Sequence, residues 1–365
     1  MASLEHTLIE ARPMTGGDGP LSYAKNSPFQ KGVVERGKFM IIEGIKNKLD
    51  FKIFDTSNKF LIADFGCSAG PNTFFGVENI IEAVGIKYRA QNKDSPPLEF
   101  QVFFNDLTDN DFNTLFRTLP SYQKYFSAGV PGSFYVRLFP KSSLHIGFSS
   151  CALLWLSKIP REVLDCNSPA WNKGSIIQCN EHSEEVAKAF LGQYASDVDT
   201  FLTSRAQEIV GGGLMVIQIP GCPDGVLMSQ TSTGITFNLF GSCLADLSKM
   251  GVIAKEKVDS FNLPLYFATV KELEEIIKKN GYFSIEKLEW DHAMFRAMKL
   301  DPQALCVQFR TVSEGLVKMH FGDNMVEEIF NYYVKKLEEN YSAYDEASNH
   351  QIEMFILLKR KTDYN

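Results

Sequence analysis

The feature that most constrains the fold is a series of short apolar runs that alternate with helical stretches. The first run, at residues 60–65, reads FLIADF and is followed by a helical pattern over residues 72–89. Further apolar runs at residues 98–104, 144–149 and 214–219 are typical of strands buried on both faces. Strands that alternate with helices predict an α/β domain with a mostly parallel sheet.

Helical patterns then dominate a long block before the chain ends. They cover residues 235–250, 270–280 and 325–341, whereas residues 282–290 and 353–361 have the apolar character of strands. The last strand must return to the sheet across this block, so the sequence predicts a helical cap inserted into the sheet domain. The expected domains are a sheet domain of residues 1–221, 282–290 and 351–365, and a cap of about 222–281 and 291–350.

Composition narrows the class of protein. The 365 residues carry 37 lysines and arginines against 44 acids, a net charge of −7, which disfavours binding to nucleic acid or to an anionic membrane. The seven cysteines include no C-x-x-C pair, so a disulfide framework or zinc site is not indicated and a reducing compartment fits. Residues 1–14 lack the apolar core of a secretory signal, and no apolar run approaches the ~20 residues of a membrane span. We therefore expect a soluble, cytoplasmic protein.

A glycine-rich loop joins the first predicted strand to its helix. Residues 64–72 read DFGCSAGPN, and loops at the carboxyl ends of strands bind ligands in open α/β sheets. Gly66 and Gly70 are four residues apart and no G-K-[ST] follows, so the loop matches neither dinucleotide nor ATP motifs. Asp64 at its start suits a cationic ligand, and S-adenosylmethionine (SAM) has both an ammonium and a sulfonium. Taken alone, the loop could also be a plain strand–helix turn.

Two further motifs suit a nucleoside. Asp106 follows the second predicted strand, where a carboxylate can accept hydrogen bonds from both ribose hydroxyls. Phe134 follows a Gly-Val-Pro-Gly turn at residues 129–132 and could stack on a base. The alternatives are an Asp that caps a turn and a Phe that belongs to the core. The sequence contains no H-E-x-x-H and its six histidines are isolated, so hydrolysis by zinc has no support.

Seven blocks of sequence occur in a characteristic order. They are SYAKNSPFQ at 22–30, IADFGCSAGPNT at 62–73, FFNDLTDNDFNTLF at 103–116, GVPGSFYVRLFP at 129–140, SSCALLWLSKIP at 149–160, NKGSI at 172–176 and VDSFNLPLY at 258–266. In these blocks the chain resembles the plant SABATH methyltransferases. The resemblance implies a Rossmann-like class I methyltransferase domain, a helical cap, SAM as the cofactor and a homodimer. The residues that match the family's cofactor contacts are Tyr23, Asp64, Gly66, Cys67, Asn72, Asp106, Leu107, Ser133, Phe134 and Ser150.

The resemblance also implies how the acceptor is held. Gln30 and Trp155 match the residues that hold the acceptor carboxylate in carboxyl methyltransferases. A carboxylate with a pKa near 4–5 is already ionised at neutral pH, so no general base is expected. The expected function is transfer of a methyl group to a small carboxylic acid, giving a methyl ester. An N-methyltransferase acting on a purine-like heterocycle and a non-catalytic binding protein are the alternatives.

By the same resemblance, the acceptor pocket is largely apolar. Its predicted residues are Cys151, Leu154, Thr236, Phe237, Leu265, Tyr266, Phe309 and Val312. Because a buried sugar hydroxyl needs a partner, this set favours an aromatic or terpenoid acid over a glucoside such as loganate.

Some family members hold Mg²⁺, and the matching positions here are Asn172, Asp259, the Phe261 carbonyl and Asn262. Oxygen ligands suit that ion. The alternative at these positions is that no metal is bound.

Overall fold

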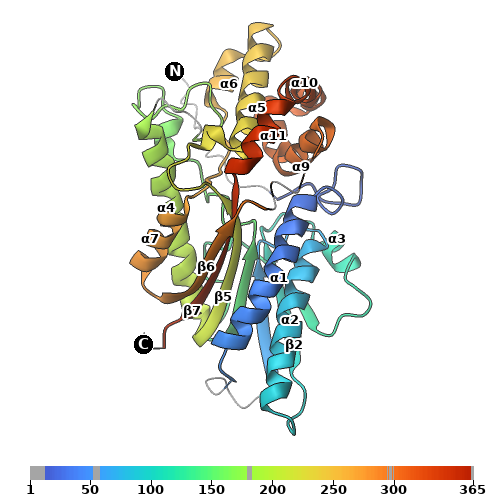
Figure 1. Ribbon diagram of the computed structural model, residues 1–365. Coiled ribbons are helices and arrows are strands. Elements are labelled where there is room, and N and C mark those ends of the chain that lie inside the picture. Colours follow the sequence, from blue (N-terminus) through green and yellow to red (C-terminus); the bar gives the residue numbers. More distant parts are fainter. Residues whose placement is uncertain are drawn as a thin grey trace.

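A seven-stranded sheet forms the centre of the molecule in the computed structural model, which describes residues 13–51, 58–178, 183–293, 295, 298 and 300–362 (Figure 1). The strand order is β3-β2-β1-β4-β5-β7-β6. The first five strands of this order pair in parallel, and β7 is antiparallel to both neighbours. The predicted mostly parallel sheet is therefore confirmed. The strands are β1 Lys59–Phe65, β2 Glu99–Asp106, β3 Phe126–Pro131, β4 Leu144–Ser150, β5 Ile209–Gly221, β6 Phe283–Asp291 and β7 Ile352–Arg360.

Helices cover both faces of this sheet. On one face α1 (Pro28–Lys48) packs against α2 (Asn72–Gln91), and on the other α4 (Glu184–Glu208) packs against α7 (Val270–Asn280). The alternation of strand side chains explains the two layers. Along β5, the even-numbered apolar residues join the core under α1 and α2, and the odd-numbered ones join the core under α4 and α7.

A second group of helices gathers at one end of the sheet, at the top of Figure 1. They form the helical cap that the sequence predicts. Their apolar core is continuous with the core on the α4 side of the sheet, so burial of a shared apolar surface holds the cap in place. These helices are α5 Ser232–Lys249, α6 Lys255–Ser260, α9 Pro302–Phe321, α10 Val326–Glu339 and α11 Tyr341–Ala347.

One helix, α7, packs on the sheet domain, although the predicted boundaries assign it to the cap. The expected cap range of 222–281 includes α7, but α7 packs against α4 and β6. Its buried residues Leu273 and Ile277 join the core of the sheet layer. We therefore propose a domain boundary before α7, with the cap formed by α5, α6 and α9–α11.

Two short elements beside the sheet have no counterpart in the predicted pattern. The edge strand β3 covers most of the predicted turn at residues 129–132, and α3 (Phe112–Arg117) precedes it. Phe126 at the start of β3 is 64 % exposed, and none of the six β3 residues is fully buried. An edge strand of this kind carries little of the apolar alternation by which strands are predicted.

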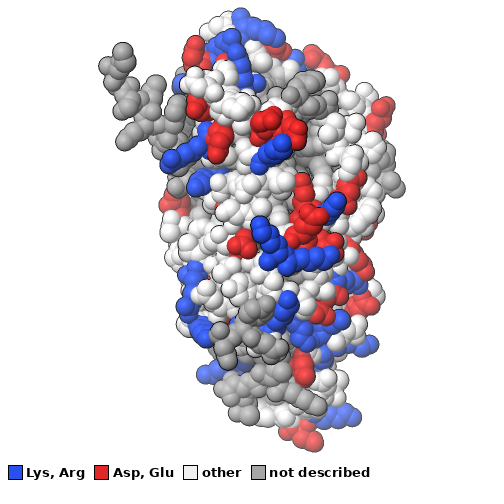
Figure 2. Space-filling view, turned by 90° about the vertical axis from the view of Figure 1, so that its left-hand side faces the viewer, with Lys and Arg blue, Asp and Glu red and all other residues white. Residues whose placement is uncertain are grey.

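The surface mixes charges of both signs. Figure 2 shows lysines and arginines intermingled with acids on the face that it presents, with uncharged areas between them. No described helix is both long and apolar enough to cross a membrane. The cysteines at positions 67, 151, 166, 222, 243 and 306 are free. Residues 1–12 of the N-terminal segment and Cys179, which also entered the predictions, lie outside the described residues.

Candidate active site

A cavity of about 320 Å³ lies between the carboxyl ends of the parallel strands and the cap. The loops after β1, β2, β3 and β4 supply one end of it, and cap helices supply the other. Its position agrees with the rule that open α/β sheets bind ligands beyond the carboxyl ends of their strands. The predicted cofactor residues that line it are Tyr23, Gly66, Asp106, Leu107, Ser133, Phe134 and Ser150.

Asp106 is fixed by two backbone groups. Its Oδ2 accepts a hydrogen bond of 2.7 Å from the Ser68 N–H, and its Oδ1 accepts one of 2.7 Å from the Leu107 N–H. Each carboxylate oxygen has a second lone pair, so the group can still accept from two neighbouring hydroxyls. Burial raises the pKa of the Asp106 carboxyl to about 6. Ser68, which also lines the cavity, has a φ of 55° and is not among the predicted cofactor residues.

Gly66 is required by the approach of two loops. Its φ is 85°, and a Cβ at this position would lie 2.3 Å from the Cβ of Ala152 and 3.6 Å from the ring of Phe134. A side chain here would therefore separate the loops that follow β1 and β4.

Asp64 lies behind the cavity lining. It is 2 % exposed, and the Thr73 hydroxyl donates to its Oδ2. Its Oδ1 is buried and has no hydrogen-bond partner among the described residues. Burial, together with the charge of Asp106, raises the pKa of the Asp64 carboxyl to about 7. This oxygen lacks a hydrogen-bond donor, and Asp64 itself is not among the residues that line the cavity, so its contact with the ammonium group of SAM stays a prediction.

Cys67 and Asn72 also lie outside the lining, although both were predicted as cofactor contacts. The Cys67 thiol donates to the Ser68 carbonyl. The Asn72 amide donates to the Ser27 carbonyl at 3.2 Å and to the Ser27 hydroxyl at 2.9 Å. These two side chains therefore support the glycine-rich loop and tie α2 to the start of α1.

The segment before α1 closes the cavity from the side of the cap. Pro13 and Met14 line it, and the Thr15 N–H donates to the Thr311 carbonyl of α9 at 3.1 Å. The Tyr23 N–H donates to the Thr15 carbonyl at 2.8 Å. This contribution is absent from the predictions, because it depends on contacts between residues some 300 positions apart.

Gln30 and Trp155 both line the cavity. Gln30 lies in the first turn of α1. Trp155 lies in an extended segment that forms an antiparallel bridge with Leu265, and the Tyr135 hydroxyl donates to its carbonyl. The structure thus brings together two predicted carboxylate-binding residues that are 125 positions apart.

The acceptor end of the cavity is mainly apolar. Seven of the eight predicted pocket residues line it, and Tyr266 does not. Tyr266 packs on Tyr194 with ring centroids 4.9 Å apart and donates to Oε1 of Glu272 at 3.0 Å. Neighbouring side chains of an extended segment point to opposite sides, so Tyr266 faces away from the side of Leu265. Further lining residues that the sequence reasoning missed are Phe29, Tyr135, Ala152, Leu156, Ser157, Pro220, Ser232, Thr233, Phe267, Phe295, Met298, Leu300, Leu305, Gln308 and Tyr344.

Two of the four predicted Mg²⁺ ligands are in contact. Asn172 and Asn262 are fully buried, and the Asn172 amide donates to Oδ1 of Asn262 at 2.7 Å. The Asn172 Oδ1 and the Asn262 Nδ2 are both buried without a partner among the described residues; the oxygen suits a cation, whereas the amide N–H group does not. Asp259 lies in α6 and is only half-buried. Among the described residues no group of three or more His, Cys, Asp or Glu side chains could hold a metal.

Comparisons with known proteins agree with this geometry. The family described as SAM dependent carboxyl methyltransferase matches residues 10–361. Loganic acid O-methyltransferase from Catharanthus roseus is 46 % identical over 97 % of this chain and 96 % of its own. Farnesoic acid carboxyl-O-methyltransferase from Arabidopsis thaliana is 44 % identical over 89 % of this chain and 92 % of its own.

A solved structure matches over nearly the whole fold. It is that of loganic acid methyltransferase with S-adenosylhomocysteine (SAH), with a TM-score of 0.92 and 46 % identity over 96 % of this chain and 99 % of that one. Since the family match spans both the sheet domain and the cap, the chain belongs to the SAM-dependent carboxyl methyltransferases.

Proposed function

We propose that this enzyme converts a small aromatic or terpenoid carboxylic acid to its methyl ester. The observation that carries the proposal is the position of Gln30 and Trp155 on a cavity with two different ends. One end has Asp106 and Phe134 for a nucleoside, and the other has apolar cap side chains. A carboxylate held by Gln30 and Trp155 would therefore lie between the two ends.

The cavity lining suits a reaction that needs no proton transfer by the protein. SAM supplies an electrophilic methyl group on a sulfonium. The described lining residues include no histidine, lysine or arginine, and Asp106 is their one carboxylate. An acceptor that arrives ionised, as a carboxylic acid does at neutral pH, needs no base. Gln30 and Trp155 would donate N–H bonds that orient one carboxylate oxygen, and such positioning can lower a barrier by as much as ~7–11 kcal/mol.

The acceptor end of the cavity, here called the acceptor wall, favours an apolar acid. Leu154, Phe237 and Leu265 line it, and none can partner a hydroxyl. Gln308 has a buried Oε1 without a partner among the described residues, so it can accept from one hydroxyl. Ser232 and Thr233 also line the cavity, while the hydroxyls of Ser157 and Thr236 already donate to Asp197 and to the Ser232 carbonyl. A glucoside brings several hydroxyls, and each hydroxyl that is buried without a hydrogen-bond partner costs ~1–3 kcal/mol. We therefore expect loganate to be a poor acceptor here.

A radiolabelled methyl-transfer assay tests the proposal. The panel contains salicylate, a cinnamate, farnesoate and loganate, and kcat/KM is compared between them. A base-labile, extractable ester formed best from the apolar acids supports it. Base-stable N-methyl product from a purine would instead support the alternative, and SAH binding without turnover of any acceptor would indicate a binding protein. A loganate value tenfold above the others would refute the apolar-wall argument.

We also propose that Asn172, Asp259, Asn262 and the Phe261 carbonyl hold Mg²⁺ in a structural role. The unpartnered Asn172 oxygen supports this, as does the 2.7 Å hydrogen bond from the Leu263 N–H to the Ile176 carbonyl that joins the same two segments. Mg²⁺ should raise the unfolding temperature of the wild type and not of an Asp259→Ala variant. We also propose a homodimer, which the family resemblance implies, and a cytoplasmic location, which rests on the scattered cysteines of the sequence. Sedimentation and cell fractionation would test them.

A further inference from the structure

A buried ion pair lies at the end of α4, away from the residues that the proposed reaction uses. Arg205 and Glu208 are both 0 % exposed, and Nε of Arg205 is 2.7 Å from Oε2 of Glu208. Burying two charges is expensive, and such a pair often contributes no more stability than apolar residues of the same size. The contacts that the pair makes with neighbouring segments therefore indicate its role better than its own contribution to stability does.

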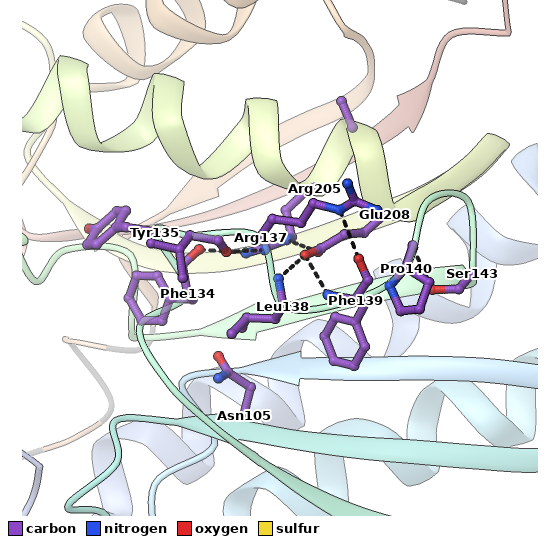
Figure 3. Close-up of polar contacts among 12 residues, drawn as sticks. Asn105, Phe134, Tyr135, Arg137, Leu138, Phe139, Pro140, Ser143, Arg205 and Glu208 are labelled. Atoms are coloured by element: carbon purple, nitrogen blue, oxygen red, sulfur yellow. Dashed lines mark hydrogen bonds and ion pairs between the residues drawn. The ribbon is translucent and has the colours of Figure 1, made fainter.

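Both side chains bind the loop that carries Phe134 (Figure 3). Nη1 of Arg205 donates to the Phe134 carbonyl at 2.6 Å, and Nη2 donates to the Val136 carbonyl at 2.9 Å. Oε1 of Glu208 accepts from two consecutive backbone N–H groups of the same loop, those of residues 138 and 139. Residues 132–143 form neither helix nor strand. Two side chains thus satisfy backbone groups that have no ladder or helix to satisfy them.

The same arginine is stacked between aromatic rings. Its guanidinium carbon lies 4.1 Å from the ring centroid of Phe65 and 5.1 Å from that of Phe201. The Phe134 ring packs on Phe201, with centroids 5.8 Å apart. Phe65 is the last residue of β1 and directly precedes Gly66. The guanidinium therefore touches both the Phe134 loop and the strand that leads into the glycine-rich loop.

We propose that Arg205 and Glu208 are positioning residues that fix Phe134 relative to the glycine-rich loop and so set the site for the adenine of the cofactor. This inference rests on the proposed role of Phe134 as the residue that contacts the adenine. The planar guanidinium matches the task, because it donates in two directions to two carbonyls while a third N–H bonds Glu208. A lysine ammonium carries the same charge but lacks this planar arrangement of N–H donors.

The variant Arg205→Lys tests the proposal. Calorimetric titration with SAH should show a Kd about tenfold higher than that of the wild type. The KM for SAM should rise in parallel, while the KM for the acid at saturating SAM stays unchanged. Glu208→Gln, which keeps the volume and an acceptor oxygen, should weaken SAH binding in the same direction and gives a second route if Arg205→Lys does not fold.

Arg360→Lys is the matched control. Arg360 is 8 % exposed and donates to the Ala206 carbonyl at 2.6 Å, in the same last turn of α4, and to the Lys361 carbonyl at 3.1 Å. It should lower the unfolding temperature about as much as Arg205→Lys and leave SAH affinity unchanged. If both variants weakened SAH binding equally, or if Arg205→Lys left it unchanged, the positioning role would be refuted.

Phe134→Ala separates this inference from the proposed function. In a double-mutant cycle, the losses from Arg205→Lys and Phe134→Ala should be less than additive, because one acts through the other. Additive losses would overturn the positioning role. If Phe134→Ala alone left SAH affinity unchanged, the adenine assignment would fail instead.

Discussion

Acidification should weaken cofactor binding through Asp64. The pKa of its carboxyl is raised to about 7, so the protonated form gains population as the pH falls below that value. A bound ammonium needs the ionised carboxylate, so protons compete with the ligand and affinity falls at lower pH. With a pKa of about 7 in the free protein, and with SAH binding only to the ionised carboxylate, the affinity for SAH should drop about eightfold between about pH 7.5 and about pH 6. The Asp106 carboxyl has a pKa of about 6, and its protonation should lower the SAH affinity by a further factor of about two over the same pH range.

Calorimetric titration with SAH at several pH values measures this slope. In Asp64→Asn, the loss of a charge-assisted hydrogen bond should lower the affinity at the upper pH by ~1.5–3 kcal/mol, and most of the pH dependence should disappear. Asn keeps the shape of the side chain and can still accept from the Thr73 hydroxyl. A wild-type affinity that is flat across this range would refute the argument, as would an Asp64→Asn variant that keeps the full slope.

Three further substitutions probe the other parts of the site. Asp106→Asn should weaken SAH binding about tenfold or more while the unfolding temperature is retained, because one ribose-binding oxygen is lost; calorimetry checks this. Gln30→Ala should raise the KM of the acid or lower kcat, by ~1–3 kcal/mol in kcat/KM, with SAH affinity unchanged; wild-type kinetics on the best acid would exclude the carboxylate role. Cys151→Tyr should narrow the pocket and shift kcat/KM toward small benzoates over farnesoate, and an unchanged ratio would remove Cys151 from the acceptor wall.

Short-range patterns predicted much of the fold and brought together much of the candidate cofactor site. The apolar run of β1 and the loop that follows it are local, and so is the position of Asp106 at the end of β2. In a parallel sheet, strand ends meet at one edge, so these residues could be expected to lie together before any contact was known. The family resemblance added Gln30 and Trp155, which no local pattern singles out.

Only the tertiary structure decided which side chains face the cavity. Leu265 and Tyr266 are adjacent, yet one lines the pocket and the other bonds Glu272, because the bridge with Trp155 sets which side of that segment faces inward. The amphipathic pattern of α7 predicts a helix with one buried face and leaves open what covers it; contacts with α4 and β6 place it beside the sheet. The pair Arg205 and Glu208 is a common i, i+3 spacing, and its link to Phe134 exists only because α4 passes beside a loop some 70 residues earlier in the chain. Local sequence determines periodicity and turns, whereas these choices depend on burial and hydrogen bonds between segments that meet only in the folded chain.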